Sequence, residues 1–201
     1  MSTGKKTEWK IEPLPREKWA GYALPFWYST DGYYDVKASK IKVGFQFRLR
    51  RVHTGLLFTI GPDEGEEGQD KLYAPWWEKA QAWGVVGEDG QLMAAIETSP
   101  EEWTNRLQVT ELWVSPALQR QGLGHALMDI AKEQTRSEGR RALILETQSC
   151  NVNAIDFYLH EGFFPIGLDT CCYTNYDMER RQVRINMGWI PEEKRRRPGR
   201  R

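Results

Sequence analysis

Two short stretches hold residues whose types and spacing could support chemistry. The first runs from Glu111 to Gly124 and reads Glu-Leu-Trp-Val-Ser-Pro-Ala-Leu-Gln-Arg-Gln-Gly-Leu-Gly. A strand that ends at Val114 and a helix that begins near Gly122 would point the free amides of residues 119–125 at one spot. That arrangement is an anion site suited to a pyrophosphate. Glycines placed only for strand-to-helix packing explain the stretch equally well, because two glycines two positions apart are a weak signal.

The second stretch contains the pattern Asn151-x-x-Ala154-x-x-Phe157-Tyr158-x-x-x-Gly162-Phe163. Together the two stretches resemble the GCN5-related N-acetyltransferase (GNAT) superfamily. In this resemblance Gln119-x-x-Gly122-x-Gly124 matches the pyrophosphate loop, and the pattern above matches the second coenzyme motif. Their order agrees, with 26 residues between Gly124 and Asn151.

The resemblance implies acetyl coenzyme A as cosubstrate and direct transfer of the acetyl group to an amine. It implies a single-domain α/β fold, a mixed central sheet flanked by helices whose central strands splay apart beyond Val114 and Thr147. The pantetheine arm would lie in that gap. The coenzyme contacts are expected at Leu112, Trp113, Val114, Gln119, Arg120, Gln121, Gly122, Leu123, Gly124, His125, Asn151, Ala154 and Tyr158.

A narrower resemblance is to streptothricin acetyltransferases. It rests on Leu145-Glu-Thr-Gln148, on the helix that carries Tyr158, on Gly167-Leu-Asp-Thr170 and on Tyr173-x-Asn175. The acceptor implied is an amino group of a small polycation. Other acceptors left open are a peptide or protein amine and a polyamine, and a non-catalytic acyl-coenzyme A sensor is the rival from another class.

Proton transfer suggests roles for the polar side chains near the expected gap. Tyr158, a phenol with a pKa of about 10, could protonate the leaving thiolate, or it could only pack beside Phe157. Glu111 is the first choice as general base and Glu146 the second, with mere attraction of cations as the alternative for each. The acceptor site is expected to be walled by Glu146, Asp169, Tyr173 and Asn175.

The elements that must position these residues follow from periodicity. Alternating apolar residues predict a half-buried strand over 41–49, and 82–86 with 92–96 predict a hairpin around Asp89-Gly90. Residues 107–114 and 141–148 predict strands that alternate with helices over 122–137 and 152–160. Further strands are predicted over 163–167, 172–175 and 183–189. The order indicates one mixed sheet with helices on its faces.

Composition limits the function classes. The 201 residues carry 28 basic and 28 acidic groups, but the last eight hold six basic groups and no acid, so the remainder carries −6. That balance disfavours a nucleic-acid-binding core, and no apolar run is long enough for a membrane helix. Three cysteines, two of them adjacent, suit a reducing compartment and a cytoplasmic protein. The three histidines have no metal spacing, so no metal site is expected.

The predicted organisation is a flexible segment over 1–10, an acetyltransferase domain over 11–190 and a basic, disordered tail over 191–201. The acid-rich stretch 61–70 is expected to be a solvated loop. A homodimer is left open.

Overall fold

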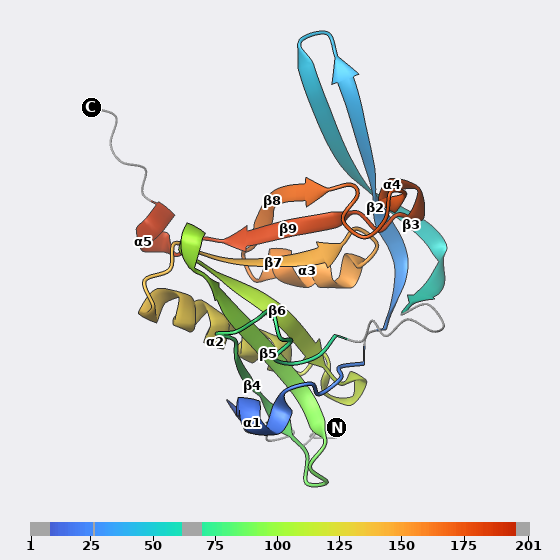
Figure 1. Ribbon diagram of the computed structural model, residues 1–201. Coiled ribbons are helices and arrows are strands. Elements are labelled where there is room, and N and C mark those ends of the chain that lie inside the picture. The colour runs from blue at the N-terminus through green and yellow to red at the C-terminus, as the bar shows by residue number, and fades with distance from the viewer. Residues whose placement is uncertain (1–8, 26, 62–69, 196–201) are drawn as a thin grey trace, which may run out of the picture.

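The computed structural model describes residues 9–25, 27–61 and 70–195 (Figure 1). Most of the expected N-terminal segment, the acid-rich loop and the basic tail lie outside the described residues. Within the described ranges, no helix is long and apolar enough to cross a membrane.

A seven-stranded mixed sheet with the strand order β1-β4-β5-β6-β7-β9-β8 forms the body of the molecule. β6 and β7 are parallel neighbours, and the other neighbouring strands are antiparallel. β2 and β3 form a separate two-stranded sheet. The strands are β1 (Glu12–Pro13), β2 (Tyr28–Ile41), β3 (Gly44–Ile60), β4 (Gln81–Val86), β5 (Leu92–Glu101), β6 (Arg106–Val114), β7 (Ala142–Gln148), β8 (Phe164–Asp169) and β9 (Arg184–Trp189).

The two long helices begin and end where the sequence predicts. Asn151 caps α3, because its side-chain Oδ1 accepts a hydrogen bond from the Ala154 amide at 3.2 Å. Gly162, with φ of +83°, follows the end of that helix, a conformation that favours glycine. The described helices are α1 (Arg16–Trp19), α2 (Leu123–Ser137), α3 (Val152–His160), α4 (Asp177–Arg180) and α5 (Glu192–Arg195), with short 3₁₀ turns η1 (Glu102–Thr104) and η2 (Pro116–Leu118).

Two apolar clusters place the layers of the fold. On one face of the sheet, α2 and α3 pack against β5, β6, β7 and β9 and contribute Leu127 and Ile155 to a large core. On the other face, residues 14–24 and 72–80 cover β4 and β5 and form a smaller core around Leu72. The prediction of a mixed sheet flanked by helices is confirmed.

One predicted strand, over 41–49, is wrong. β2 ends at Ile41 and β3 begins at Gly44, so the alternating residues straddle a tight turn. Phe45 and Phe47 are exposed rather than half-buried. Alternation describes a ribbon with one apolar face, and it does not say whether the protein covers that face.

The strand predicted over 172–175 is also absent. This segment bends into α4 instead, because buried Asp177 accepts hydrogen bonds from the backbone of the preceding turn. Its Oδ1 receives the amide and hydroxyl of Thr174 at 2.7 and 2.8 Å, and its Oδ2 receives the Tyr173 amide at 3.0 Å. A short acidic side chain competes here with strand pairing for the backbone donors.

Candidate active site

The parallel strands β6 and β7 separate near the middle of the sheet. They pair only from Arg106 to Gln108 and from Ala142 to Ile144. Beyond these residues β6 keeps β5 on one side, where Leu112 lies opposite Ile96, and its other edge faces the gap. The separation lets groups from both faces of the sheet reach one space.

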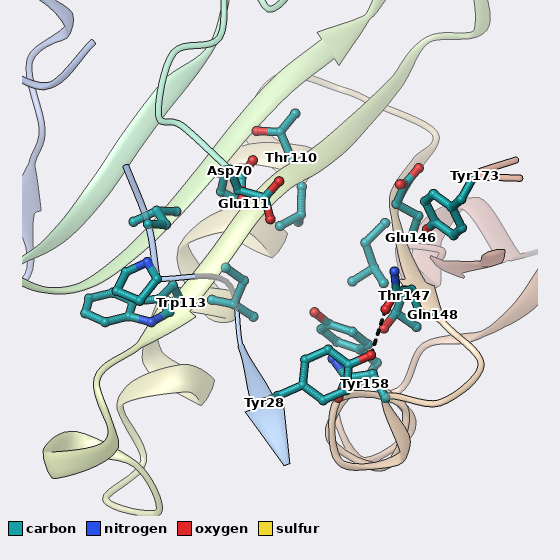
Figure 2. A pocket seen from close by; sticks show the side chains of 16 residues that line it. Tyr28, Asp70, Thr110, Glu111, Trp113, Glu146, Thr147, Gln148, Tyr158 and Tyr173 are labelled. Carbon is teal, nitrogen blue, oxygen red and sulfur yellow. Dashed lines mark hydrogen bonds between the residues drawn. The ribbon is translucent and has the colours of Figure 1, made fainter. Parts of the chain in front are cut away.

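A cavity of about 250 Å³ fills this gap (Figure 2). Glu111 approaches it from β6, Glu146 from β7 and Tyr158 from α3, while Asp70 lies on the segment that precedes β4. Three carboxyl groups thus share one cavity. Its other walls are Leu24, Pro25, Tyr28, Val109, Thr110, Leu112, Trp113, Leu145, Thr147, Gln148, Asn151 and Tyr173.

A β-bulge sets the direction of Glu111. Glu97 of β5 lies opposite Glu111, but Thr98 lies opposite Val109, so Thr110 is the extra residue. The Thr110 hydroxyl donates to Oε1 of fully buried Glu97 at 2.7 Å. Oε2 of Glu97 accepts the Tyr73 amide at 2.5 Å.

Burial makes Glu111 an unusual carboxyl group. Loss of water contact, followed by the nearby charges of Asp70, Glu97 and Glu146, raises the pKa of Glu111 to about 9. Burial also raises the pKa of Asp70 and of Glu146. An ion pair with Arg184 opposes this rise for Glu146. The cavity therefore favours a cation that could balance its carboxylates.

Tyr158 stands at the helix side of the cavity. Its ring packs against Phe157 at 5.5 Å and Phe163 at 6.0 Å between centroids, so the packing expected as an alternative role is present. Its hydroxyl has no hydrogen-bond partner in the described part of the chain. Burial, followed by the charge of Glu111, raises the pKa of Tyr158 to about 12, so the phenol holds its proton at neutral pH.

A second hollow, of about 370 Å³, adjoins this cavity and shares Tyr28, Leu112, Trp113 and Asn151 with it. It runs along the free edge of β6 to Val114 and Gln119. Of the residues expected to contact the coenzyme, the structure places Leu112, Trp113, Val114, Gln119 and Asn151 along this hollow.

The turn before α2 has the conformation its glycine predicts. Gly122 has φ of +86°, and a Cβ there would meet no atom within 4 Å, so the backbone faces open space. The first helical bond runs from the Ala126 amide to the Gly122 carbonyl at 3.0 Å, which leaves the amides of Leu123, Gly124 and His125 without a carbonyl one turn earlier. Arg120 also has a positive φ, of 58°. This is a backbone suited to an anion.

Two residues expected at the acceptor site do not reach the cavity. Asp169 is exposed on β8, where its Oδ1 accepts the Cys171 amide at 3.0 Å, and Asn175 is exposed beside α4. Tyr173 does line the cavity. Cys150 is buried beside the cavity, with its Sγ 3.1 Å from the Tyr28 hydroxyl.

Sequence reasoning missed Tyr28, Asp70 and Glu97. Tyr28 enters from the start of β2, and its hydroxyl donates to Gln148 Oε1 at 2.7 Å (Figure 2). Asp70 was expected in a solvated loop, yet it reaches the cavity. These residues belong to no local motif, because only the tertiary fold brings them to β6 and β7.

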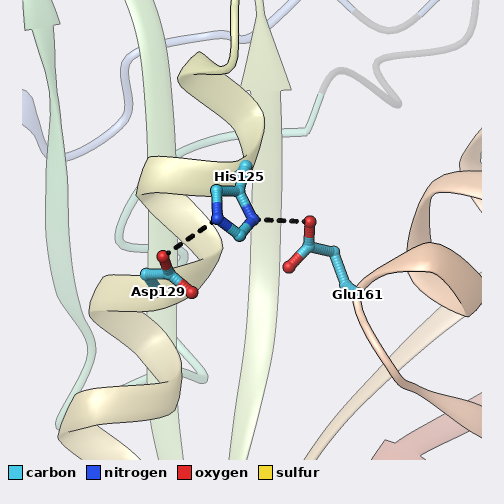
Figure 3. Close-up of side chains that lie close together, drawn as sticks. All are labelled: His125, Asp129 and Glu161. Carbon is cyan, nitrogen blue, oxygen red and sulfur yellow. Dashed lines mark hydrogen bonds and ion pairs between the residues drawn. The ribbon is translucent and has the colours of Figure 1, made fainter.

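A group of polar side chains joins α2 to the end of α3 (Figure 3). His125 Nδ1 lies 2.8 Å from Glu161 Oε1, and its Nε2 lies 3.2 Å from Asp129 Oδ2. Lys132 Nζ donates to the other oxygen of Glu161 at 2.5 Å. Burial raises the pKa of Glu161, but its hydrogen bonds and electrostatic interactions with Lys132 and His125 outweigh burial and hold that pKa below its usual range. Possible metal-ligand atoms of His125, Asp129 and Glu161 lie within 4.8 Å of one another, but the Lys132 ammonium already donates to Glu161, so the group links the start of α2 to the end of α3.

A splayed pair of parallel strands, an acidic cavity and a glycine turn at a helix start together define an α/β protein with a site for an anionic ligand beside an acidic cavity. The chain belongs to the acetyltransferase (GNAT) family, whose model matches residues 52–163, more than half of its length. It is an N-acetyltransferase with the fold of that family.

Known proteins resemble the chain to different extents. The crystal structure of nourseothricin acetyltransferase superimposes with a TM-score of 0.71 at 26% identity and covers 92% of this chain and 99% of that one. A structure described as a streptothricin acetyltransferase from Bacillus anthracis str. Ames, in complex with acetyl coenzyme A, gives 0.65 at 18% identity, with 91% and 99% covered, and shares the fold.

Two relatives match in sequence. An uncharacterized N-acetyltransferase of Escherichia coli (strain K12), YjgM, is 27% identical over 132 residues, which are 65% of this chain and 79% of that protein. Streptothricin acetyltransferase A of Bacillus subtilis (strain 168) is 30% identical over 74 residues, 37% of this chain and 43% of that protein.

Proposed function

We propose that this acetyltransferase uses acetyl coenzyme A to acetylate one amino group of a small cationic acceptor, and that a streptothricin-type antibiotic is its substrate. The observation that carries the proposal is the cavity at the strand gap, where Asp70, Glu111 and Glu146 meet the protonated phenol of Tyr158. The likeness to nourseothricin and streptothricin acetyltransferases supports this choice of acceptor. Acetylation removes the positive charge of the amine. A cell with this enzyme in its cytoplasm would thereby become resistant to the antibiotic.

The residues along the second hollow fit a coenzyme with an extended, amide-bearing arm and a pyrophosphate. The free edge of β6 at Leu112–Val114 offers backbone groups to the pantetheine amides. The amides of the turn from Gln119 to His125, together with the Arg120 guanidinium, would hold the phosphates. Asn151, which lines both hollows, and Ala154, which follows it in α3, would border the pantetheine chain. The bound coenzyme supplies an activated acetyl thioester to the cavity.

Glu111 is suited to take the proton of the attacking amine. An alkylammonium has a pKa of about 10.4, so transfer of its proton to ionised Glu111, with a pKa of about 9, costs about 2 kcal/mol, and ionising Glu111 first at pH 7.4 costs about 2 kcal/mol more. Transfer to a carboxylate with its ordinary pKa of 4.5 would cost about 8 kcal/mol. Because Glu111 is protonated in the free protein at neutral pH, the entering ammonium is expected to displace that proton to solvent.

Tyr158 completes the proton balance. The amine nitrogen forms a bond to the acetyl carbonyl carbon, and the bond from that carbon to sulfur breaks. The Tyr158 hydroxyl gives its proton to the departing thiolate. The second proton, which the nitrogen loses as the amide forms, passes through solvent to restore the phenol, and Glu111 returns the first proton to solvent. A positioned acid of this kind typically contributes about 10²–10⁴-fold to the rate.

The charge of the cavity favours an acceptor with more than one cationic group. One ammonium can pair with Glu111 and Asp70 remains to attract another, while Glu146 already pairs with Arg184. Because salt screens such attraction beyond about 8 Å at physiological ionic strength, kcat/KM for a polycation should fall as salt rises. Deletion of the basic residues 194–201 should not weaken the reaction, since they repel the same acceptor.

The experiment is a steady-state comparison of amines by release of free coenzyme A thiol. Streptothricin, spermidine and a peptide with a free N-terminus are tested at two salt concentrations. The proposal expects the highest kcat/KM for streptothricin and the steepest salt dependence for it. Faster turnover of the peptide or of spermidine would assign the enzyme to another acceptor, and binding of acetyl coenzyme A without turnover of any amine would indicate a sensor.

A further inference from the structure

The ribbon of β2 and β3 leaves the body of the protein as an arm. Its root is fixed: the Tyr34 amide donates to the Ser149 carbonyl at 2.8 Å, and both carboxylate oxygens of Asp156 lie 2.8 Å from Arg51 Nη1. Beyond Val36, which is buried, the ribbon extends away from the sheet and the helices (Figure 1). We call residues 37–48 the arm.

The strand register gives the arm two different faces. Directly opposed residues of an antiparallel pair share a face. Ala38 lies opposite Phe47 and Lys40 opposite Phe45, so this face continues the apolar stripe that begins at buried Val36. Along it, Phe47 is 55% exposed and Phe45 is 80% exposed, and Val43 at the turn is 88% exposed. The opposite face carries Lys37 against Arg48 and Ser39 against Gln46.

This apolar stripe lacks a cover within the described chain. A two-stranded ribbon is marginally stable in water unless its apolar face packs on something. Contiguous exposed apolar surface on a soluble protein commonly marks an interaction site. The arm therefore has the properties of a surface that a second molecule covers.

The distribution of charge along the chain indicates which molecule covers the arm. The arm, residues 37–48, contains four basic groups and no acidic group, which leaves 24 basic against 28 acidic groups in the rest of the chain. The chain is neutral only as the sum of a basic arm and an acidic remainder. The remainder of a second copy of the same protein is thus opposite in net charge to the arm.

The body also offers a face that could receive the arm. β8 is an edge strand that pairs with β9 alone in the described sheet. Its Phe164 is 39% exposed and its Ile166 is 43% exposed. Beside them a hollow of about 260 Å³ opens over β7 and β9, and in it Glu101 pairs with Arg106 and Glu146 with Arg184. Exposed apolar side chains thus lie at this edge, as the apolar stripe of the arm requires.

We propose that the protein is a twofold-symmetric dimer in which the arm of each protomer packs its Phe45 and Phe47 face on the β8–β9 edge of the other. An isologous contact of this kind uses both surfaces twice and closes on itself. It leaves neither apolar surface in water.

The test is the molar mass in solution, measured by light scattering after size exclusion at micromolar concentration. The wild-type chain of 23.4 kDa should run as a dimer. The double variant Phe45→Ser/Phe47→Ser should run as a monomer with unchanged circular dichroism. Ile166→Asp should do the same from the receiving side. The matched control, Leu56→Ser/Leu57→Ser, removes two exposed apolar residues of β3 outside the arm and should remain dimeric.

A shortened ribbon covers the case in which the serine variants fail to fold. Residues 38–47 are replaced by Asn-Gly, which joins the opposed pair Lys37 and Arg48 by a tight turn. This variant should be a folded monomer. A monomeric wild type, or a dimer that survives all arm changes, would overturn the proposal. A wild-type monomer that sediments with phosphatidylserine vesicles, or that binds duplex RNA through the arm, would assign the arm to that partner instead.

Discussion

Glu111→Gln is expected to stabilise the protein and to inactivate it. The glutamate has a pKa of about 9 in the folded protein and 4.5 as its ordinary value. Between these values the unfolded chain is ionised and the folded chain is protonated, so stability falls as pH rises from 4.5 towards 9. At pH 7.4 the gap of about three units corresponds to about 4 kcal/mol, and water reaching the half-buried group reduces it to about 1–3 kcal/mol. Glutamine cannot ionise and escapes this loss.

Urea unfolding of wild type and Glu111→Gln at pH 4.5, 7.4 and 9 measures the effect. The gain in unfolding free energy should be near zero at pH 4.5 and should grow with pH, while kcat/KM at pH 7.4 falls by about 10²–10⁴-fold. Glu88→Gln, at an exposed position of the β4–β5 turn, is the control and should show no such growth. A gain that does not depend on pH, or a loss of stability, would refute the buried-carboxyl argument.

Three further changes have distinct expected outcomes. Tyr158→Phe keeps the ring packing and removes the proton, so kcat should fall at least about tenfold with unchanged acetyl coenzyme A binding by calorimetry; near-wild-type kcat would show that the tyrosine only packs. Gly122→Val puts a branched residue at φ of +86°, and coenzyme affinity should fall in a folded protein; unchanged affinity would contradict the phosphate-loop assignment. Lys132→Met leaves buried Glu161 without its closest cation and should destabilise the protein by about 3 kcal/mol in urea unfolding, whereas an unchanged midpoint would show that the pair is not structural.

Short-range patterns in the sequence predicted the helices next to the second hollow, the one along the free edge of β6 that we propose for the coenzyme. The stripe of Leu123 and Leu127 predicted α2, and the spacing from Asn151 to Gly162 predicted α3. In each case the residues that specify the element lie within a few turns of one another, so the sequence alone contains the information.

The acceptor side depends on contacts between distant segments. Tyr28 and Asp70 meet Glu111 only after the chain has folded, and their spacing carries no signal. Asp169 follows a predicted strand, but its short side chain binds its own turn instead of reaching the cavity. The arm was predicted as a half-buried strand because period-two alternation gives the apolar face and not its cover.

The central claim is acetylation of a cationic amine in the acidic cavity. Streptothricin is incubated with acetyl coenzyme A and either wild type, Glu111→Gln or Glu88→Gln, and the products are identified by tandem mass spectrometry. We expect one acetyl group on one side-chain amine with wild type and with Glu88→Gln, and at most traces with Glu111→Gln. Streptothricin left unmodified by an enzyme that rapidly acetylates a peptide or a simple polyamine would contradict the account.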